Sequence, residues 1–198
     1  ASLLSWERGD GGLFDTDRIL LAKYYNVANS AFEFGVGESS KIAAYTNMPN
    51  FKGVDSDPVW VGIARDMAPS HFRFELLDIG ATREWGYPLN NSLAKIPLNY
   101  MTQPLISEPK AFDFYLVDGR YRVACALISF LHALSRGASR DDIRVAIHDY
   151  IAREQYNDIE IWTDRVECAE RLCVFKLKDG VTEAVLADAW KERKFISA

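Results

Sequence analysis

The stretch that decides the fold is Ala31-Phe32-Glu33-Phe34-Gly35-Val36-Gly37-Glu38-Ser39-Ser40. It is typical of a short strand followed by a tight glycine turn and the start of a helix. Two glycines one residue apart let the backbone turn sharply and approach a ligand, because neither carries a Cβ atom. Ser39 and Ser40 can cap the helix, whose N-terminal amides attract negative groups. Glu33 is poorly placed for a phosphate but well placed to accept hydrogen bonds from a ribose or an amino group, so the stretch indicates a nucleoside ligand.

The composition is that of one ordinary folded domain. The chain has 198 residues, 48% hydrophobic and 26% charged, which is enough apolar material for a core. Its net charge of −5 disfavours binding to nucleic acid or to an anionic membrane surface. The apolar runs are too short to span a membrane, and no signal-peptide pattern opens the chain. We expect a single domain over residues 1–198, and the absence of an initial Met is compatible with a fusion to other domains.

Three cysteines, Cys125, Cys168 and Cys173, lie in apolar runs. Their number is odd and their spacing matches no zinc or redox motif. We therefore expect all three to be buried and reduced. Such usage fits a reducing compartment and predicts a cytoplasmic location.

Strands and helices are expected to alternate. The predicted strands cover residues 31–34, 51–55, 72–78, 112–118 and 143–147, and a closing hairpin pairs residues 158–168 with residues 171–177. The predicted helices cover residues 15–27, 39–45, 57–67, 121–134 and 181–193. This alternation predicts an α/β fold with a doubly wound, mostly parallel seven-stranded sheet and a C-terminal antiparallel hairpin.

Residues 80–111 interrupt the alternation. They contain four prolines and little periodic structure, which is unusual in a compact domain and is often functional. They also carry large apolar side chains, among them Trp85 and Tyr87. This insertion either packs against the domain or forms one wall of a substrate pocket.

The strand ends point to a family. Ligands bind at the carboxyl ends of the strands in such sheets, and the predicted parallel strands end on Glu33, Asp55, Asp78, Asp118 and the His148–Asp149 pair. Together with the glycine turn, this ordered row of acids resembles the class I, Rossmann-like methyltransferases that use S-adenosylmethionine. The resemblance covers residues 15–178.

The resemblance implies a role for each strand end. Glu33 and the two glycines would hold the methionine part of the cofactor, and Asp55 would accept hydrogen bonds from the ribose hydroxyls. Asp78 would border the adenine, and Asp118 would lie beside the reactive methyl group. The full cofactor set implied is Glu33, Gly35, Gly37, Ser39, Asp55, Ser56, Asp78, Ile79 and Asp118.

The later strand ends are similar to those of small-molecule O-methyltransferases that act on sugar hydroxyls. In these enzymes acidic residues after the two strands hold a divalent metal, and the same place here is filled by Asp118, His148 and Asp149. His148 stands where the family has a carboxylate. This set could hold Mn, whereas Mg prefers oxygen ligands throughout.

An alcohol acceptor requires a base, and His is the usual choice near neutral pH. We expect His148 or Asp118 to be that base, with Asp149 orienting the imidazole or the substrate. The acceptor is expected to be a small molecule or a glycan, and no nucleic acid is expected as a partner. The candidate acceptor-binding residues are Trp85, Tyr87, Arg120, Tyr121, Arg122 and Tyr150.

Two other functions compete with methyl transfer. A nicotinamide-dependent Rossmann oxidoreductase would explain the glycine turn and Asp55. The third glycine of the dinucleotide fingerprint is missing, however, because Glu38, Ser39 and Ser40 follow Gly37. A methyltransferase-like domain can also act as a non-catalytic binding module.

Overall fold

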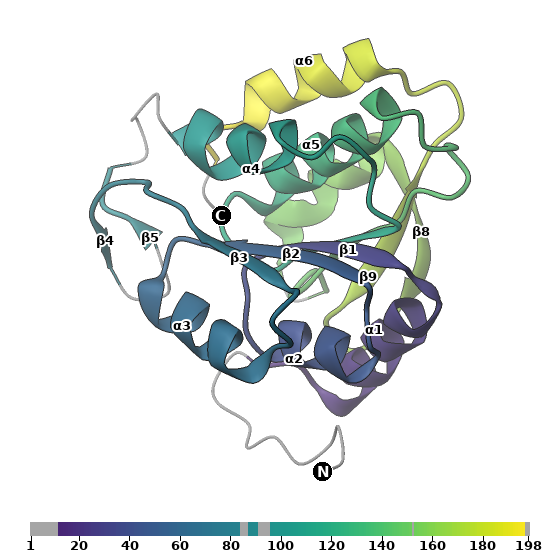
Figure 1. Cartoon of the computed structure of the whole chain (residues 1–198). Coiled ribbons are helices and arrows are strands. Elements are labelled where there is room, and N and C mark those ends of the chain that lie inside the picture. The colour runs from purple at the N-terminus through teal and green to yellow at the C-terminus, as the bar shows by residue number, and fades with distance from the viewer. Residues whose placement is uncertain (1–11, 84–86, 91–95, 152, 197–198) are drawn as a thin grey trace.

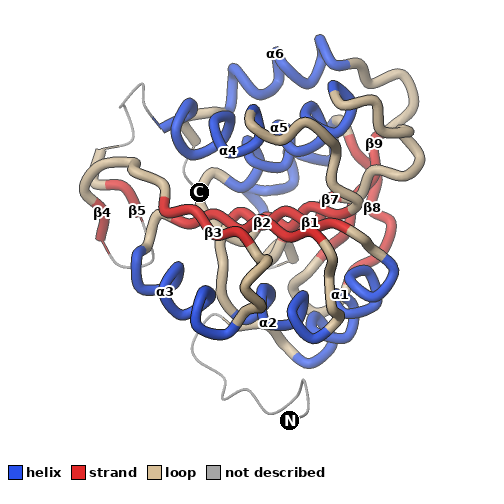
Figure 2. The backbone as a smooth tube through the Cα atoms, in the orientation of Figure 1, coloured by secondary structure: helices blue, strands red, loops and turns tan. Residues whose placement is uncertain are grey.

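A seven-stranded sheet runs through the centre of the molecule (Figures 1 and 2). The computed structural model describes residues 12–83, 87–90, 96–151 and 153–196. The strand order is β3-β2-β1-β6-β7-β9-β8, in which the first five strands are parallel, β9 is antiparallel to β7, and β8 is antiparallel to β9. This confirms the predicted fold class. The strands are β1 Ser30–Phe34, β2 Asn50–Asp55, β3 Arg73–Leu76, β6 Phe114–Val117, β7 Val145–Ile147, β8 Thr163–Cys168 and β9 Cys173–Leu177.

Helices cover both faces of this sheet. Figure 1 shows α1, α2 and α3 on one face and α4, α5 and α6 on the other. Two buried apolar clusters lie on opposite sides of the sheet, and the one under α5 is the larger. The helices are α1 Asp15–Val27, α2 Glu38–Tyr45, α3 Pro58–Met67, α4 Gln103–Ile106, α5 Arg122–Ser135 and α6 Glu183–Arg193.

Local chemistry sets where the helices near the strand ends begin. The Asp57 carboxylate accepts the N–H of Val59 at 2.9 Å, and Pro58 occupies the first turn of α3, where its missing N–H costs nothing. In α5 almost every position is buried, because the helix packs between the sheet and α6. The α3 and α5 N-termini therefore lie next to the carboxyl ends of β2 and β6.

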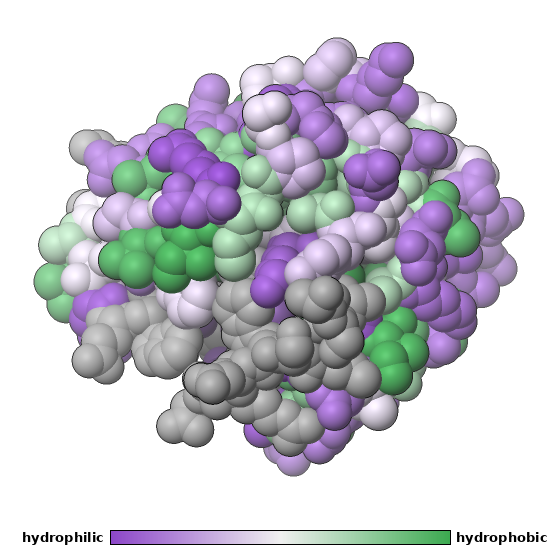
Figure 3. Space-filling view, turned by 60° about the horizontal axis from the view of Figure 1, so that its bottom comes forward, coloured by the Kyte–Doolittle hydropathy of each residue, from purple (hydrophilic) through white to green (hydrophobic). Residues whose placement is uncertain are grey.

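The insertion is built from short elements. It holds the two-stranded ribbon of β4 Thr82–Arg83 and β5 Tyr87–Pro88, the π-helix η2 Pro97–Thr102 and then α4. Tyr100 and Met101 are buried in the main core, so this part packs against the domain. On the face that Figure 3 shows, hydrophilic residues border the apolar patches.

Two details of the C-terminal region differ from the prediction. The predicted strand over residues 158–168 begins only at Thr163, because residues Glu154–Ile161 form the 3₁₀ helix η3. Cys168 and Cys173 face each other across the β8–β9 pair and form a disulfide. The expectation of reduced thiols is therefore wrong for these two residues. Cys125 is buried and forms no disulfide with the described cysteines, as expected. A disulfide between two of the three cysteines removes the support that cysteine usage gave to a reducing compartment.

Among the described residues, no helix is both long enough and apolar enough to cross a membrane.

Candidate functional site

The glycine turn is pressed against the end of β6. Gly35 has a φ of +88°, a conformation that side chains rarely adopt, and a Cβ atom here would lie 2.6 Å from the carbonyl of Asp118. The Gly35 N–H donates to the carbonyl of Val54, and the Asp118 N–H donates to the carbonyl of Phe34. The turn is thus held between the neighbouring strands β2 and β6, and only glycine fits at its first position.

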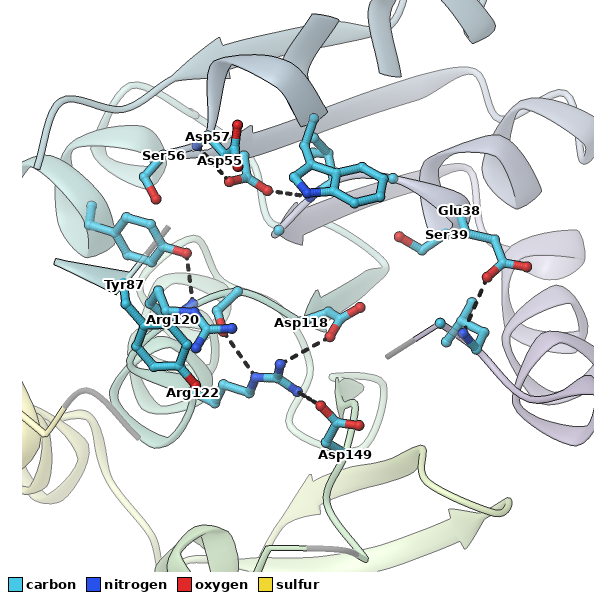
Figure 4. Close-up of a pocket in the computed structure, with 18 of the residues that line it drawn as sticks. Glu38, Ser39, Asp55, Ser56, Asp57, Tyr87, Asp118, Arg120, Arg122 and Asp149 are labelled. Atoms are coloured by element: carbon cyan, nitrogen blue, oxygen red, sulfur yellow. Dashed lines mark hydrogen bonds and ion pairs between the residues drawn. The ribbon is translucent and has the colours of Figure 1, made fainter. Parts of the chain in front are cut away.

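A cavity of about 420 Å³ opens at this edge of the sheet, at the carboxyl ends of β1, β2, β6 and β7. Figure 4 shows side chains from all of these strand ends turned toward one space. A cavity of this size suits a small-molecule ligand. Of the residues that the resemblance assigned to the cofactor, those that line the cavity are Gly35, Gly37, Ser39, Asp55, Ser56 and Asp118.

Glu33 lies behind the turn. It is completely buried and is not among the described residues that line the cavity. Its carboxylate accepts hydrogen bonds from the hydroxyls of Tyr25, Ser39 and Ser40, at 2.6, 3.0 and 2.5 Å. Burial raises the pKa of Glu33 to about 7, against these hydrogen bonds, which favour the carboxylate. The direct cofactor contact expected of Glu33 is not what the geometry shows, because its oxygens are already used to brace the turn.

Asp55 faces the cavity from the end of β2. Its two oxygens accept the backbone N–H groups of Val36 and Asp57, at 3.0 and 2.9 Å. Burial raises the pKa of Asp55 to about 6, although both hydrogen bonds favour the charged form. The carboxylate therefore links the glycine turn to the loop after β2 at the wall of the cavity.

Asp78 and Ile79 lie after β3 and are not among the described residues that line the cavity. Asp78 is exposed and its carboxylate accepts the N–H of Gly80, whereas Ile79 is buried in the core. Their expected place beside an adenine therefore gains no support from the cavity.

His148 is buried between carboxylates from two distant parts of the chain. Its Nδ1 lies 3.0 Å from the Asp118 carboxylate, and its Nε2 lies 3.8 Å from that of Asp17. Burial would lower the pKa of His148, but the carboxylates of Asp118, Asp17 and Asp149 outweigh it and raise the pKa to about 10. Burial also raises the pKa of Asp118, and the charges of His148 and Arg122 more than reverse this and lower it. At neutral pH an imidazolium thus faces a carboxylate.

This arrangement corrects the expected role of His148. The ring is buried, is not among the described residues that line the cavity, and already carries a proton at neutral pH. A group in this state cannot take a proton from an acceptor. Asp118 is the member of the pair that faces the cavity, and His148 orients it.

Arg122 occupies the space between the two carboxylates (Figure 4). Its guanidinium lies 3.3 Å from the Asp118 oxygen and 3.2 Å from that of Asp149. Arg153 and Arg171 approach Asp149 as well, at 3.4 and 3.5 Å. Asp149 is therefore held by three arginines.

The proposed metal set does not fit a divalent cation. One ligand atom each from Asp118, His148 and Asp149 lies within 4.8 Å of the others. Arg122 nevertheless fills the gap between the two carboxylates, and the His148 ring is protonated, whereas a metal needs a neutral imidazole. The structure does not support Mg or Mn at this position.

The expected acceptor-binding residues that the structure describes divide into two groups. Tyr87, Arg120 and Arg122 line the cavity. Tyr121 and Tyr150 are buried and are not among its described lining: Tyr121 packs in the core, and the Tyr150 hydroxyl donates to Glu160. Trp85 lies outside the described residues.

The sequence reasoning missed several lining residues. Trp60 in α3, Tyr100 in η2 and Arg153 before η3 all line the cavity. Trp60 lies in the first turn of α3, directly after the acidic end of β2, and this position is a sequence signal for the cavity wall. Tyr100 belongs to the insertion, for which a pocket wall is one of the two predicted roles, whereas Arg153, directly before η3, carries no comparable signal.

The arrangement of strands, helices and glycine turn defines a class of fold, the Rossmann-like methyltransferase fold. The structure is similar to a methyltransferase-like protein from Silicibacter pomeroyi DSS-3, with a TM-score of 0.74 and 22% sequence identity over 94% of this chain and 96% of that one. It is also similar to a ribosomal protein L11 methylase from Lactobacillus delbrueckii subsp. bulgaricus, with a TM-score of 0.51 and 12% identity over 81% of this chain and 77% of that one. No family model and no curated protein matches the sequence.

Proposed function

We propose that this chain binds S-adenosylmethionine in the cavity and transfers its methyl group to a small-molecule acceptor. One observation carries the proposal: the glycine turn, the Asp55 carboxylate and the Asp118 carboxylate border the same cavity at the carboxyl ends of β1, β2 and β6. Gly35 and Gly37 would admit the methionine part, and Asp55 would accept the ribose hydroxyls. The fold of the neighbouring structures is compatible with this activity.

The acceptor that we propose carries a hydroxyl, and a sugar is one such acceptor. Its oxygen bonds to the methyl carbon as the carbon–sulfur bond breaks, the electron pair leaves with the sulfur, and the hydroxyl proton passes through Asp118 to solvent. S-adenosylmethionine supplies the electrophilic methyl group. The chain aligns the two reactants and excludes water. Asp118 is a weak base, because His148 and Arg122 lower its pKa, so positioning is its larger contribution.

Calorimetric titration tests this function. We expect S-adenosylhomocysteine to bind with one site per chain and NAD to give no heat above dilution. Binding of NAD alone would instead make the chain an oxidoreductase. Binding of neither would leave a non-catalytic module. A screen of hydroxylated small molecules by mass spectrometry, with a gain of one methyl group as readout, then identifies the acceptor.

The affinity for S-adenosylhomocysteine is expected to decrease as the pH is lowered, because Asp55 takes up a proton. The ribose hydroxyls need the carboxylate form, and the pKa of Asp55 is about 6. Below that pH the affinity should fall up to about tenfold per pH unit, because only the ionised fraction binds. Titrations at pH 5, 6, 7 and 8 measure this effect.

Asp55→Asn is expected to bind S-adenosylhomocysteine weakly at every pH, and its affinity should no longer change around pH 6. Glu33, whose pKa is about 7, also titrates in this range, so Glu33→Gln is the matched control. The affinity of Glu33→Gln should still change around pH 6. An unchanged pH profile in Asp55→Asn would remove Asp55 from the ribose site.

A further inference from the structure

Arg120 is a buried cation that forms no direct ion pair among the described residues. Only 8% of the surface of Arg120 is exposed to solvent, and its guanidinium forms no ion pair with any residue that the structure describes. Its Nε is buried and finds no hydrogen-bond partner within that same part of the chain. Burying an uncompensated guanidinium is costly. A cavity-lining cation in this state is suited to an anion that arrives with a ligand.

The Arg120 side chain is nevertheless held in one place. Its guanidinium lies over the ring of Tyr87, 3.9 Å from the ring centroid, and its backbone N–H donates to the Tyr100 hydroxyl at 2.9 Å. Arg153 approaches the same tyrosine: burial raises the pKa of the Tyr87 hydroxyl, but the guanidinium groups of Arg120 and Arg153 outweigh this and lower it. We call Tyr87, Arg120 and Arg153 the Arg120 corner.

The acids nearby are already neutralised. Asp149 is shared by Arg122, Arg153 and Arg171, and Asp118 is paired with Arg122 and with the protonated His148. Arg120 therefore adds a positive charge that no direct ion pair with a described residue balances to this side of the cavity, in a chain whose net charge is −5. An acidic protein that gathers cations at one side of one cavity has a local preference for an anion.

We propose that the Arg120 corner binds a carboxylate or phosphate group of the methyl acceptor. This inference rests on the proposed function. Figure 4 shows Tyr87 and Arg120 across the cavity from Glu38 and Ser39, which follow the glycine turn. With the cofactor at the turn and at Asp55, the Arg120 corner is left for the acceptor. Arginine presents a planar fork that matches carboxylate and phosphate oxygens, and the stacked tyrosine leaves that fork little freedom to lose.

A phosphate titration of the protein saturated with S-adenosylhomocysteine tests the site. The probe is inorganic phosphate at constant ionic strength, followed through the backbone amide signal of Gly119, which lines the cavity, and the Arg120 Nε–H signal. We expect a saturable shift of both. Arg120→Gln should weaken phosphate binding by about tenfold or more, because a charge-assisted hydrogen bond is lost.

Arg83→Gln is the matched control. Arg83 lies over the same Tyr87 ring, 5.5 Å from its centroid, but is exposed and is not among the described residues that line the cavity. Its phosphate affinity should equal that of the wild type. Arg120→Lys, which keeps the charge and loses the fork, should bind with intermediate affinity and also serves if Arg120→Gln does not fold. Absence of saturation in the wild type, or equal affinity in Arg120→Gln, overturns the proposal.

The carboxylate of the cofactor is the other source of such an anion, and a second pair of titrations separates the two. S-adenosylhomocysteine carries that carboxylate and 5′-methylthioadenosine lacks it. If Arg120 serves the acceptor, Arg120→Gln binds both nucleosides as the wild type does. Selective loss of S-adenosylhomocysteine overturns the acceptor assignment. A wild type that binds phosphate at Arg120 but neither nucleoside overturns the proposed function, and leaves an anion site without a methyl acceptor.

Discussion

Gly35→Ala is expected to abolish binding of S-adenosylhomocysteine and to lower the free energy of unfolding by about 3 kcal/mol. Two costs add. Alanine resists a φ of +88°, and its Cβ would lie 2.6 Å from the Asp118 carbonyl carbon and oxygen and 2.7 Å from the Gly119 nitrogen. These are backbone atoms, so no side chain can rotate away, and β1 must separate from β6 where the cavity begins. Urea denaturation and calorimetry measure the two effects.

Gly137→Ala separates the collision from the backbone strain. Gly137 has a φ of +79°, close to that of Gly35, but a Cβ there meets no atom within 4 Å. This variant should lose about 1–2 kcal/mol and bind S-adenosylhomocysteine normally. If both variants lost the same stability and both kept the ligand, the close contact between the turn and β6 would have no part in binding.

The fold was predictable because its signals are local. A tight strand-to-helix turn requires the glycines at 35 and 37, and Asp55 marks the end of a strand. Each of these features is recognised from a few neighbouring residues. The order of these signals along the chain then places them at one edge of a parallel sheet. Long-range partners were not needed for any of these steps.

The side-chain directions in the site were less predictable, because they depend on partners far away in the sequence. Tyr121 follows the β6 strand end, as a ligand-binding residue would, but it has a φ of +55° and packs into the core. Glu33 turns inward to Tyr25 in α1. Arg153 lies between β7 and η3 and lines the cavity, and no local sequence pattern predicts this.

His148 shows the same limit most clearly, since its position after β7 was predicted and its ionisation state was not. A histidine at a strand end near neutral pH reads as a base. Asp17, at the start of α1, changes that reading. One Asp17 oxygen, Oδ2, lies near His148 Nε2. The other, Oδ1, accepts the backbone N–H groups of Arg171 and Leu172, so the carboxylate is fixed beside the imidazole. Folding thus assembles an acid–imidazolium–acid arrangement from three separate segments.

A direct consequence is that stability should fall as the pH rises from about 7 to 10. In the unfolded chain His148 loses its proton near its ordinary pKa of about 6.5, whereas in the folded chain it keeps the proton until about pH 10. Its stabilising contribution is complete below pH 6.5 and is lost as the pH rises through the folded pKa. Within this window the free energy of unfolding should lose up to about 1.4 kcal/mol per pH unit from this one group.

Urea denaturation at half-unit steps between pH 6 and pH 10 measures the slope, and His148→Gln should flatten it. His132→Gln is the matched control: burial lowers the pKa of His132, whose Nδ1 lies 2.8 Å from the Tyr115 hydroxyl, so folding does not favour the protonated form of this ring. Its replacement should shift the curve without changing the slope. Nuclear magnetic resonance of the His148 ring should show no titration between pH 6 and pH 8. A midpoint in that interval would return His148 to the role of a base, because a neutral ring beside Asp118 could accept the acceptor's proton.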